Sequence, residues 1–209
     1  MPDWTLEEKC SGFVCGIDEA GRGPWVGPVV AGAVVFKTKE INPELTADLN
    51  DSKKLSAKKR EKLYALLREE EKNGNVYIGV GEASAEEIDT LNILQATFLA
   101  MKRAVSALPI TPDFALIDGN RLPTEFICPA SCHIGGDAKS YSIAAASIIA
   151  KVFRDNLMKE LAQKYPWYGF EKNAGYGTKD HVAGLQKYGI IKGEHRLSYK
   201  PVKAFMQKI

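Results

Sequence analysis

The sequence Cys15-Gly16-Ile17-Asp18-Glu19-Ala20-Gly21-Arg22-Gly23-Pro24 decides how the rest of the chain is organised. Apolar residues alternate with small ones up to the two acids, which predicts a short and largely buried strand. Consecutive side chains of a strand point to opposite faces of the sheet. The two adjacent acids can therefore serve one site only if the strand ends at them, and the glycines and proline that follow predict that it does.

Asp18 and Glu19 are candidates for binding a divalent metal ion. Buried acids are costly unless a cation accompanies them, and the basic residue nearest in the sequence is Arg22. Carboxylate oxygens are the ligands that Mg²⁺ and Mn²⁺ prefer. The glycines on either side of Arg22 let a ligand approach the backbone closely, beside a guanidinium suited to phosphate. Taken alone, the same residues also fit an exposed acidic turn.

The composition predicts one cytosolic globular protein of 209 residues, with 45% hydrophobic and 26% charged residues. No apolar run approaches the ~18 residues that a membrane span requires, and the N-terminal sequence does not resemble a signal peptide. A formal net charge of +2 permits a nucleic-acid partner without requiring one. The basic residues that cluster between Lys53 and Lys62 fit either a phosphate-facing patch or a solvated helix face.

Four cysteines, Cys10, Cys15, Cys128 and Cys132, raise the question of a zinc site, since His133 follows the last of them. Their spacings miss the Cys-x2-Cys pattern of common structural zinc sites. Cys15 also belongs to an apolar strand. Reduced, packed thiols are therefore the favoured interpretation.

The hydrophobic pattern predicts an α/β protein. Val and Ala enrichment predicts a second strand over 26–36, paired with the first through the glycine turn. The other expected elements are a loop over 37–55, a helix from the N-cap Ser56 to 72, a strand over 76–80, a capping box at Ser84 and Glu87, helices to 108 divided at Asn92, a short strand near 126–128, a helix over 141–162, and a helix over 178–188.

A continuous apolar strand over 114–117 ends in Asp118, so a second strand terminates in an acid. Sites in open α/β sheets gather where strand ends meet loops, which makes Asp118 a candidate to join Asp18. Asp137 precedes the helix over 141–162, where the helix dipole tolerates a negative charge. It also fits a simple cap or loop acid.

From residue 165 onward, aromatic and basic residues are interleaved. This pattern suits contact with bases, sugars and phosphates, and it equally suits a small appendage packed on the main body. We expect one structural unit, with a catalytic core over 1–164 and a C-terminal helical extension over 165–209.

Seven sequence blocks resemble, in order, the signature blocks of the bacterial, single-subunit ribonuclease HII family. A single acid pair would be weak support, whereas this ordered set is specific and spans nearly the whole chain. The blocks are Asp18-Glu19-Ala20-Gly21-Arg22-Gly23-Pro24, Asn50-Asp51-Ser52-Lys53-Lys54-Leu55-Ser56, Ile117-Asp118-Gly119, Gly136-Asp137-Ala138-Lys139, Ser142–Val152 with Arg154-Asp155, Gly175-Tyr176-Gly177-Thr178, and His195-Arg196-x-Ser198.

The resemblance implies an RNase H-like fold, a mixed five-stranded sheet flanked by helices, with a small C-terminal helical extension. It implies metal-dependent cleavage of the RNA strand of RNA–DNA hybrids and incision 5′ of single ribonucleotides embedded in duplex DNA, leaving 3′-hydroxyl and 5′-phosphate ends. Asp18, Glu19, Asp118 and Asp137 match the family's catalytic carboxylates. We expect them to hold two Mn²⁺ or Mg²⁺ ions during catalysis, with Asp18 bridging the ions.

The resemblance also implies how the substrate is recognised. Gly21, Arg22 and Gly23 match a ribose-sensing loop, and Tyr176 matches a tyrosine that reads the junction between ribose and deoxyribose. His195 is the histidine expected to matter, through orienting the tail. The expected phosphate and substrate contacts beyond the loop are Lys53, Lys54, Lys139, Ser140, Lys151 and Arg196.

Two other functions fit some of these features. An RNase H-fold DNA resolvase or integrase would share the clustered acids but not the ribose-sensing loop, and a catalytically silent hybrid-binding module would not need all four acids. We expect a monomer that binds hybrid or ribonucleotide-containing duplexes and no membrane. A replication clamp is a possible partner, for which the tail Ala204-Phe205-Met206-Gln207 is a weak indication.

Overall fold

Strand β1 (Val14–Ala20) lies at the centre of a five-stranded sheet in the computed structural model of the chain, which describes residues 1–49, 52 and 55–206. The strand order is β3-β2-β1-β4-β5. The other strands are β2 (Val29–Phe36), β3 (Val76–Ala83), β4 (Phe114–Asp118) and β5 (Ala130–His133). β1 pairs antiparallel with β2 and parallel with β4, so the predicted mixed five-stranded sheet is confirmed.

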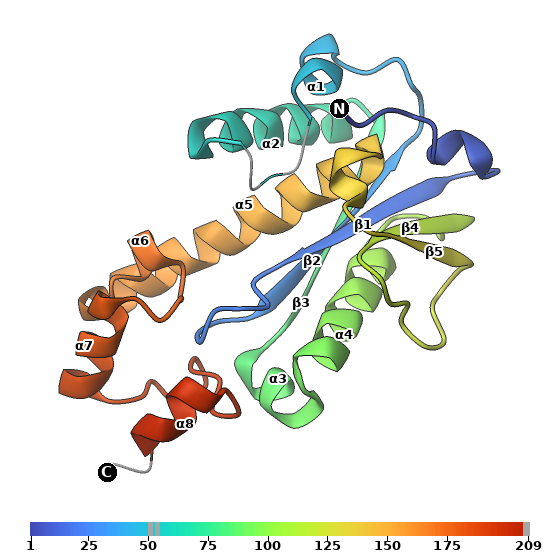
Figure 1. Cartoon of the computed structure of the whole chain (residues 1–209). Coiled ribbons are helices and arrows are strands. Elements are labelled where there is room, and N and C mark those ends of the chain that lie inside the picture. The colour runs from blue at the N-terminus through green and yellow to red at the C-terminus, as the bar shows by residue number, and fades with distance from the viewer. Residues whose placement is uncertain (50–51, 53–54, 207–209) are drawn as a thin grey trace.

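Helices cover both faces of the sheet (Figure 1). α3 (Ala85–Leu91) and α4 (Ile93–Ser106) lie on one face, where Met101 and Val105 pack against Cys15 and Ile17. α5 (Tyr141–Lys164) crosses the other face, with α2 (Ala57–Lys72) beside it. The chain is thus a three-layer α/β structure, and β1 is buried between both helical layers.

Small residues let α5 approach the sheet closely. A Cβ atom added at Gly16 would lie 2.1 Å from the backbone carbon of Ser142, and one added at Gly32 would lie 2.5 Å from the carbonyl oxygen of Ala146. The alanines of α5 that face the sheet are fully buried. The first turns of α5 therefore lie directly over the strand that carries Asp18.

The predicted helix starts are confirmed. The Ser56 side chain accepts from the Lys59 amide, and Ser84 forms the reciprocal capping box with Glu87. Asn92 adopts φ 71° and caps α4 with its side chain, which divides α3 from α4. These caps satisfy amide groups that have no partner within the helix.

The strand predicted over 26–36 begins only at Val29, and three short elements also differ from the prediction. The segment expected as a loop contains α1 (Pro43–Asp48), and the strand expected near 126–128 is β5, a few residues later. The helix α8 (Lys200–Met206) was not predicted. Elements of four to seven residues contain too few periods for a hydrophobic pattern to emerge, and β5 is defined by its pairing with β4.

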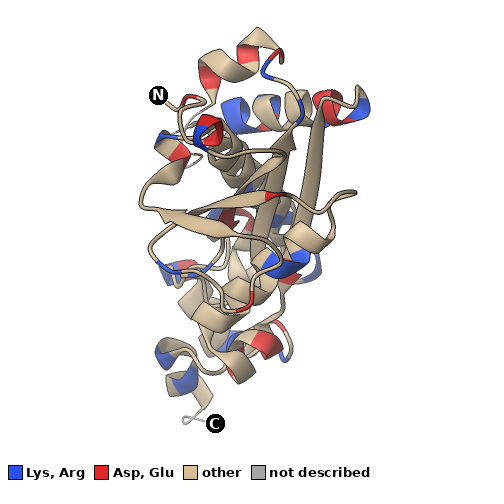
Figure 2. Ribbon diagram, turned by 90° about the vertical axis from the view of Figure 1, so that its right-hand side faces the viewer, with Lys and Arg blue, Asp and Glu red and all other residues tan. Residues whose placement is uncertain are grey.

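The tail folds against the end of α5. It comprises η3 (Pro166–Tyr168), α6 (Phe170–Asn173), α7 (Lys179–Tyr188) and α8, with Tyr168 and Phe170 buried against Met158 and Leu161. Figure 2 shows Lys and Arg without neighbouring acids on the last helix before the C terminus. Within the described part of the chain, no helix combines the length and apolarity needed to cross a membrane.

Candidate active site

Asp18 and Asp118 lie side by side at the sheet edge. β1 and β4 run parallel with Ile17 opposite Ile117, so the next residue of each strand is an aspartate. Gly16 faces the start of α5, and Leu116 packs with Ile143 of the same helix. Because strand side chains alternate, both aspartates share this α5-facing side.

Glu19 belongs to the opposite face of β1. The strand does not end at Asp18 as expected, because pairing with β2 continues to Ala20. Glu19 therefore projects towards α4, where it lines a pocket of about 360 Å³ with Thr97 and Met101. β4 stops at Asp118, which lines the same pocket. Glu19 and Asp118 therefore share a pocket because β4 ends early, and not because β1 ends.

Asp137 comes from a segment that contacts the end of β4. It lies in η2 (Gly136–Ala138), just before α5, and is 7% exposed. The amide of its neighbour Gly136 donates to Asp118 Oδ1 at 2.7 Å. The segment that carries Asp137 is thus tied directly to the Asp118 carboxylate.

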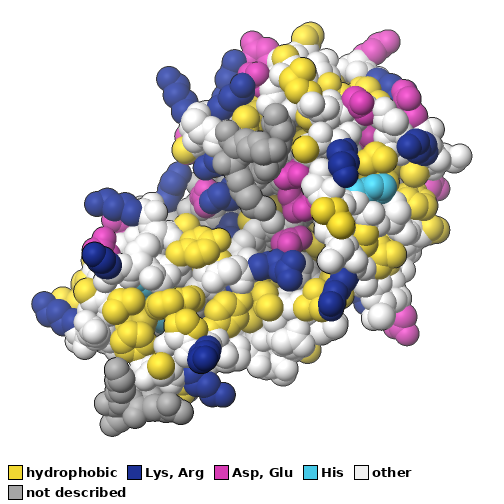
Figure 3. All heavy atoms as spheres, in the orientation of Figure 1, with side chains coloured by type: hydrophobic (Ala, Val, Ile, Leu, Met, Phe, Trp, Pro, Cys, Tyr) yellow, Lys and Arg dark blue, Asp and Glu magenta, His cyan; other side chains and the backbone are white. Residues whose placement is uncertain are grey.

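A second pocket, of about 280 Å³, adjoins the first. Glu19 and Arg22 line both pockets, so the two pockets meet at these side chains. The second pocket brings together residues from three distant parts of the sequence, Glu19, Gly21, Arg22, Gly23, Lys151 and Tyr176. Figure 3 shows acidic side chains gathered near the centre of this view, with Lys or Arg directly below them.

The four carboxylates match a hard divalent metal ion in donor chemistry. All supply oxygen, and Asp18 is buried at 4% exposure where a charge needs a cation. The Arg22 guanidinium lies 3.3 Å from Glu19 Oε1. Among residues 1–49, 52 and 55–206, no three His, Cys, Asp or Glu side chains are grouped so as to hold an ion in this structure. The donor types fit, and the ligand assignment remains a prediction.

Arg196 is a correction to the expected phosphate contacts. Its side chain is 0% exposed, and its guanidinium donates to the carbonyl oxygens of Gly21, Arg22 and Gly27 at 2.6 to 3.0 Å. Tyr199 also donates its hydroxyl to the Arg22 carbonyl. Arg196 therefore shapes the glycine loop from inside instead of facing a phosphate.

Arg154 of α5 holds the backbone that follows the glycine loop, and the sequence pattern assigns it no role. It donates to the carbonyls of Val26, Pro28 and Ala174 at 3.0 to 3.1 Å. Burial, and secondarily the charge of Arg196, lower the pKa of Arg154 to about 10. In the sequence Arg154 is one of several charged residues in the second half of the helix, so no local pattern marks it as buried. Such a buried cation needs nearby acceptors.

Ser140 is likewise buried at 0% exposure. Its hydroxyl accepts from the Ile143 amide as the N-cap of α5 and donates to Glu7 Oε1 at 2.6 Å. Helix capping occupies this side chain, so the expected substrate contact through Ser140 is not supported by its position.

Tyr176 packs over the glycine loop. A Cβ atom at Gly23 would lie 3.2 Å from the Tyr176 ring. Tyr176 lines the second pocket and is 53% exposed. Trp25 occupies the space beside Gly177, where a Cβ would come within 2.0 Å of the indole, and its amide donates to the Gly175 carbonyl. The tail loop and the glycine loop are therefore built as one unit.

The remaining predicted contacts occupy different environments. Lys139 is exposed and donates to the Ile134 carbonyl, while Lys151 lines the second pocket and forms an ion pair with Asp155. Lys53 and Lys54 lie outside the described residues. Basic residues of α2 pair with acids, Lys59 with Asp48 and Lys62 with Glu44, as expected of a solvated helix face.

The cysteines are free, as predicted. Cys15 is buried within the sheet, and burial raises the pKa of its thiol beyond the usual range. Cys132 pairs with Ile117 in the sheet, and burial and the nearby Asp118 raise the pKa of its thiol. Both remain protonated thiols at neutral pH.

Known proteins resemble the chain over nearly all its length. The sequence profile described as Ribonuclease HII matches residues 15–202. Ribonuclease HII of Rhodospirillum rubrum is 53% identical over 97% of this chain and 91% of that protein, and the enzyme of Paramagnetospirillum magneticum is 50% identical over 99% of both.

Solved structures show the same fold. Ribonuclease H2 from Pyrococcus horikoshii OT3 superposes with a TM-score of 0.75 at 28% identity, covering 94% of this chain and 98% of that one. The RNase HII that was solved in complex with PCNA, from Archaeoglobus fulgidus, gives a TM-score of 0.69 at 26% identity and covers 90% and 95% of the two chains. Bst-RNase HIII, solved in complex with Mn²⁺, shares the fold at 19% identity, with a TM-score of 0.73 over 95% of this chain and 70% of that one.

Proposed function

The chain belongs to the ribonuclease HII family and is a ribonuclease H, a hydrolase that acts on RNA–DNA hybrids, and from this premise we propose that it also incises duplex DNA 5′ of single embedded ribonucleotides. The products would carry 3′-hydroxyl and 5′-phosphate ends. One observation carries the proposal: the acid Glu19, the glycine loop and Tyr176 line one pocket. A cleavage site and a ribose-sensing surface are then in contact.

Asp18, Glu19, Asp118 and Asp137 are the residues that would hold the metal ions. When bound, two Mg²⁺ or Mn²⁺ ions supply activation of the attacking water and neutralisation of the leaving 3′-oxygen. The chain's own contribution is placement. The parallel register sets Asp18 beside Asp118, and the Gly136 amide at Asp118 Oδ1 orients that carboxylate.

The glycine loop would sense the ribose. Arg196 holds the carbonyls of Gly21 and Arg22 from inside the protein, and Arg154 holds those of the neighbouring Val26 and Pro28, which leaves the pocket side of the glycine loop available to a 2′-hydroxyl. A 2′-hydroxyl both donates and accepts, so backbone groups can distinguish it from hydrogen. Tyr176, exposed above Gly23, would stack on the next sugar, where a deoxyribose fits better than a ribose.

Lysine and arginine side chains around the pocket would contact phosphates. Arg22 and Lys151 line it. Lys139 is exposed and lies two residues after Asp137 in the sequence, and Lys53 and Lys54 are further expected contacts. Arg196 and Ser140 act from inside, by shaping the loop and capping α5.

We expect this protein to act as a cytoplasmic monomer, with residues 165–209 packed on the catalytic core. The A. fulgidus RNase HII forms a complex with PCNA, and a replication clamp is accordingly a possible partner here. The surface for it would lie in the last helix, whose Phe205 packs in part against the tail core and whose Met206 is exposed. Gln207 lies outside the described residues.

One gel tests the proposed function. Three duplexes are compared, one with a single embedded ribonucleotide, one all-DNA and one RNA–DNA hybrid, each with and without a chelator. We expect metal-dependent incision of the first and third, and no cleavage of the all-DNA duplex that a resolvase would cut. Failure to incise the single-ribonucleotide duplex while the hybrid is cleaved would contradict the proposal.

A further inference from the structure

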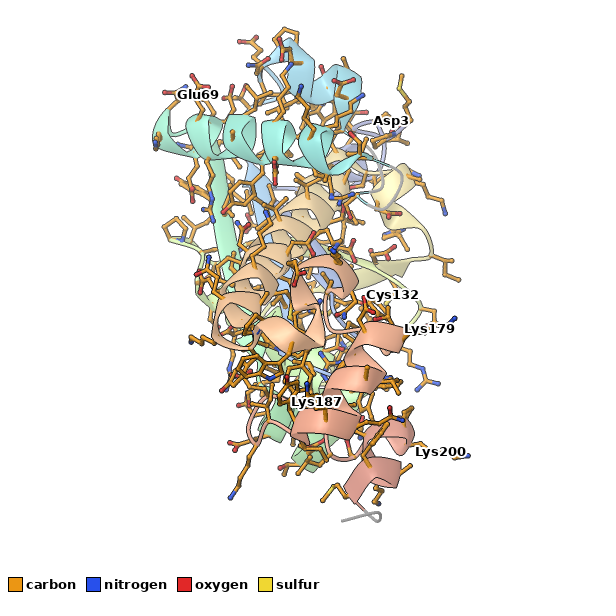
Figure 4. The ribbon with its side chains drawn as sticks, turned by 90° about the vertical axis from the view of Figure 1, so that its left-hand side faces the viewer. Asp3, Glu69, Cys132, Lys179, Lys187 and Lys200 are labelled. Atoms are coloured by element: carbon orange, nitrogen blue, oxygen red, sulfur yellow. The ribbon has the colours of Figure 1, made fainter. Side chains whose placement is uncertain are left out.

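Two histidines of the tail are buried against each other, next to the loop that carries Tyr176. His181 lies in the first turn of α7, the helix on which Figure 4 labels Lys179 and Lys187, and His195 follows the loop after that helix. Their exposures are 0% and 1%, and their Nε2 atoms lie 3.1 Å apart. The hydrolysis proposed above uses neither ring.

The hydrogen bonds at the outer ends of the pair fix both tautomers. His181 Nδ1 lies 3.0 Å from the carbonyl oxygen of Tyr176, which can only accept, so this nitrogen carries a proton. The Ile191 amide donates to His195 Nδ1 at 3.0 Å, so that nitrogen is bare. The Ile191 carbonyl, 3.3 Å away, already accepts from the amides of Glu194 and His195.

The inner bond then has one direction. A neutral imidazole carries a single proton, so the proton of His195 is on Nε2 and the Nε2 of His181 is bare. The hydrogen bonds therefore run in one direction, from the Ile191 amide through His195 and His181 to the Tyr176 carbonyl. A further proton on His181 Nε2 would face the proton on His195 Nε2, and one on His195 Nδ1 would face the Ile191 amide hydrogen. The pair is therefore uncharged.

This chain of hydrogen bonds ends at the backbone carbonyl of Tyr176, whose side chain faces the glycine loop. The Tyr176 carbonyl accepts from His181 and from the Thr178 amide, and the Tyr176 amide donates to the Asn173 carbonyl. Its backbone is therefore held from beneath while its ring stays exposed over Gly23.

We propose that His181 and His195 are positioning residues that fix the Tyr176 backbone through a directed, uncharged N–H···N chain and thereby set discrimination at the ribose–deoxyribose junction. The inference rests on the proposed reading role of Tyr176. Burial supports the uncharged state, since it lowers the pKa of His181 and, together with the neighbouring ring of His181, that of His195 to about 4.

The first measurement is the tautomeric state of the wild-type protein by long-range ¹H–¹⁵N NMR. We expect the proton on Nδ1 of His181 and on Nε2 of His195, with a through-hydrogen-bond coupling between the two Nε2 nuclei. The reverse tautomers, or a charged ring at pH 7, would overturn the proposal without any assay of cleavage.

A matched pair of variants tests the positioning role. In His181→Asn the amide lies where Nδ1 was and can still donate to Tyr176, whereas in His181→Gln it lies where Nε2 was and meets only His195. The readout is the ratio of the single-ribonucleotide rate to the hybrid rate, with the melting temperature recorded for both. We expect His181→Gln to lower this ratio on the order of tenfold and His181→Asn to keep it within about threefold.

Tyr176→Ala is the reference. If it leaves the ratio unchanged, the reading role of Tyr176 fails. If it lowers the ratio while both His181 variants keep it, or if both variants lower it equally, the positioning role fails and the histidines serve stability alone.

Discussion

At the scale of single residues, the shape of the glycine loop and its neighbours depends on buried side chains that bond to their backbone. Arg154 and Arg196 are buried cations whose acceptors are backbone carbonyls of the glycine loop and of its neighbours. Sequence reasoning found the loop itself, because glycine and acid side chains carry recognisable chemistry. It assigned Arg196 to a phosphate, because a basic residue next to aromatic ones fits both uses and only burial separates them.

Replacing Gly21 tests how tightly the loop is held. Gly21 has φ +95°, and an added Cβ would lie 2.0 Å from Arg154 Nε, which three hydrogen bonds keep in place. We expect Gly21→Ala to lower the free energy of unfolding by about 2 kcal/mol or more and to impair ribonucleotide incision. Chemical denaturation and the cleavage assay measure the two effects.

Gly74→Ala is the control for this change. Gly74 has φ +77° with nothing within 4 Å of an added Cβ, so it suffers the backbone strain alone. Its expected cost is about 1 kcal/mol with normal activity. Equal losses for the two variants would show that Arg154 does not constrain the loop.

The histidine pair predicts loss of stability in acid. Burial lowers the pKa of His195 from 6.5 to about 4, so below pH 6.5 the unfolded chain binds a proton that the folded protein does not. The stabilisation is complete above pH 6.5 and is lost as pH falls towards 4. Between pH 7.5 and 5 we expect His195 to reduce the free energy of unfolding by about 2 kcal/mol. Urea denaturation of wild type and His195→Gln would reveal the difference, and identical pH profiles would contradict it.

At the scale of elements, the offset lengths of β1 and β4 organise the acids. β1 continues past Asp18 to Ala20, while β4 stops at Asp118 and opens the pocket beside Glu19. The sequence predicted both strands and both acids but placed the end of β1 too early. The position of a strand end depends on its pairing partner, here β2, and that information is not local.

The start of α5 depends on the N-terminal segment, which sequence reasoning had not connected to the site. Glu7, in η1 (Glu7–Lys9), accepts with Oε1 from the Ser140 hydroxyl and from the Ser142 amide and hydroxyl at 2.6 to 2.9 Å. These residues follow directly after the segment that carries Asp137. A separation of more than 130 residues between the partners hides this contact from any local pattern.

Glu7→Ala should therefore weaken both stability and turnover. It leaves buried donors at the start of α5 without an acceptor, for an expected cost of about 1–3 kcal/mol. The matched control is Glu8→Ala, because Glu8 is exposed and its ion pair with Lys39 is worth about 0–1 kcal/mol. Thermal and urea denaturation of the two variants decide the matter, and comparable small losses would count against the role of Glu7.

At the scale of the whole molecule, residues from three distant parts of the sequence, Glu19 to Gly23, Lys151 and Tyr176, line one pocket. The fold was predictable because the central elements are long or strongly apolar and the family blocks span the chain. The tail's relation to the core was less predictable, since Arg154, Trp25 and His181 make contacts that depend on the finished tertiary structure. These contacts tie the loop that carries Tyr176 to α5, to Trp25 and to α7.

Hybrid binding should depend on salt although the net charge is only +2. We expect the slope of log K against log salt concentration to fall by about 1 in magnitude for Arg22→Ala or Lys151→Ala, each removing one phosphate contact. Lys62→Ala serves as the control, since Lys62 pairs with Glu44 on the α2 surface. Fluorescence anisotropy across a salt series measures the slopes, and three equal slopes would disprove the assignment.

The central claim is that four carboxylates from distant parts of the sequence work as one metal-dependent cleavage site. The most direct measurement is single-turnover cleavage of an RNA–DNA hybrid by Asp18→Asn at saturating enzyme, with hybrid affinity measured in parallel. We expect the rate to fall by about a thousandfold or more while the affinity is kept, because the substitution removes a charge at the reacting centre and no expected phosphate contact. Turnover equal to that of the wild type would contradict the claim.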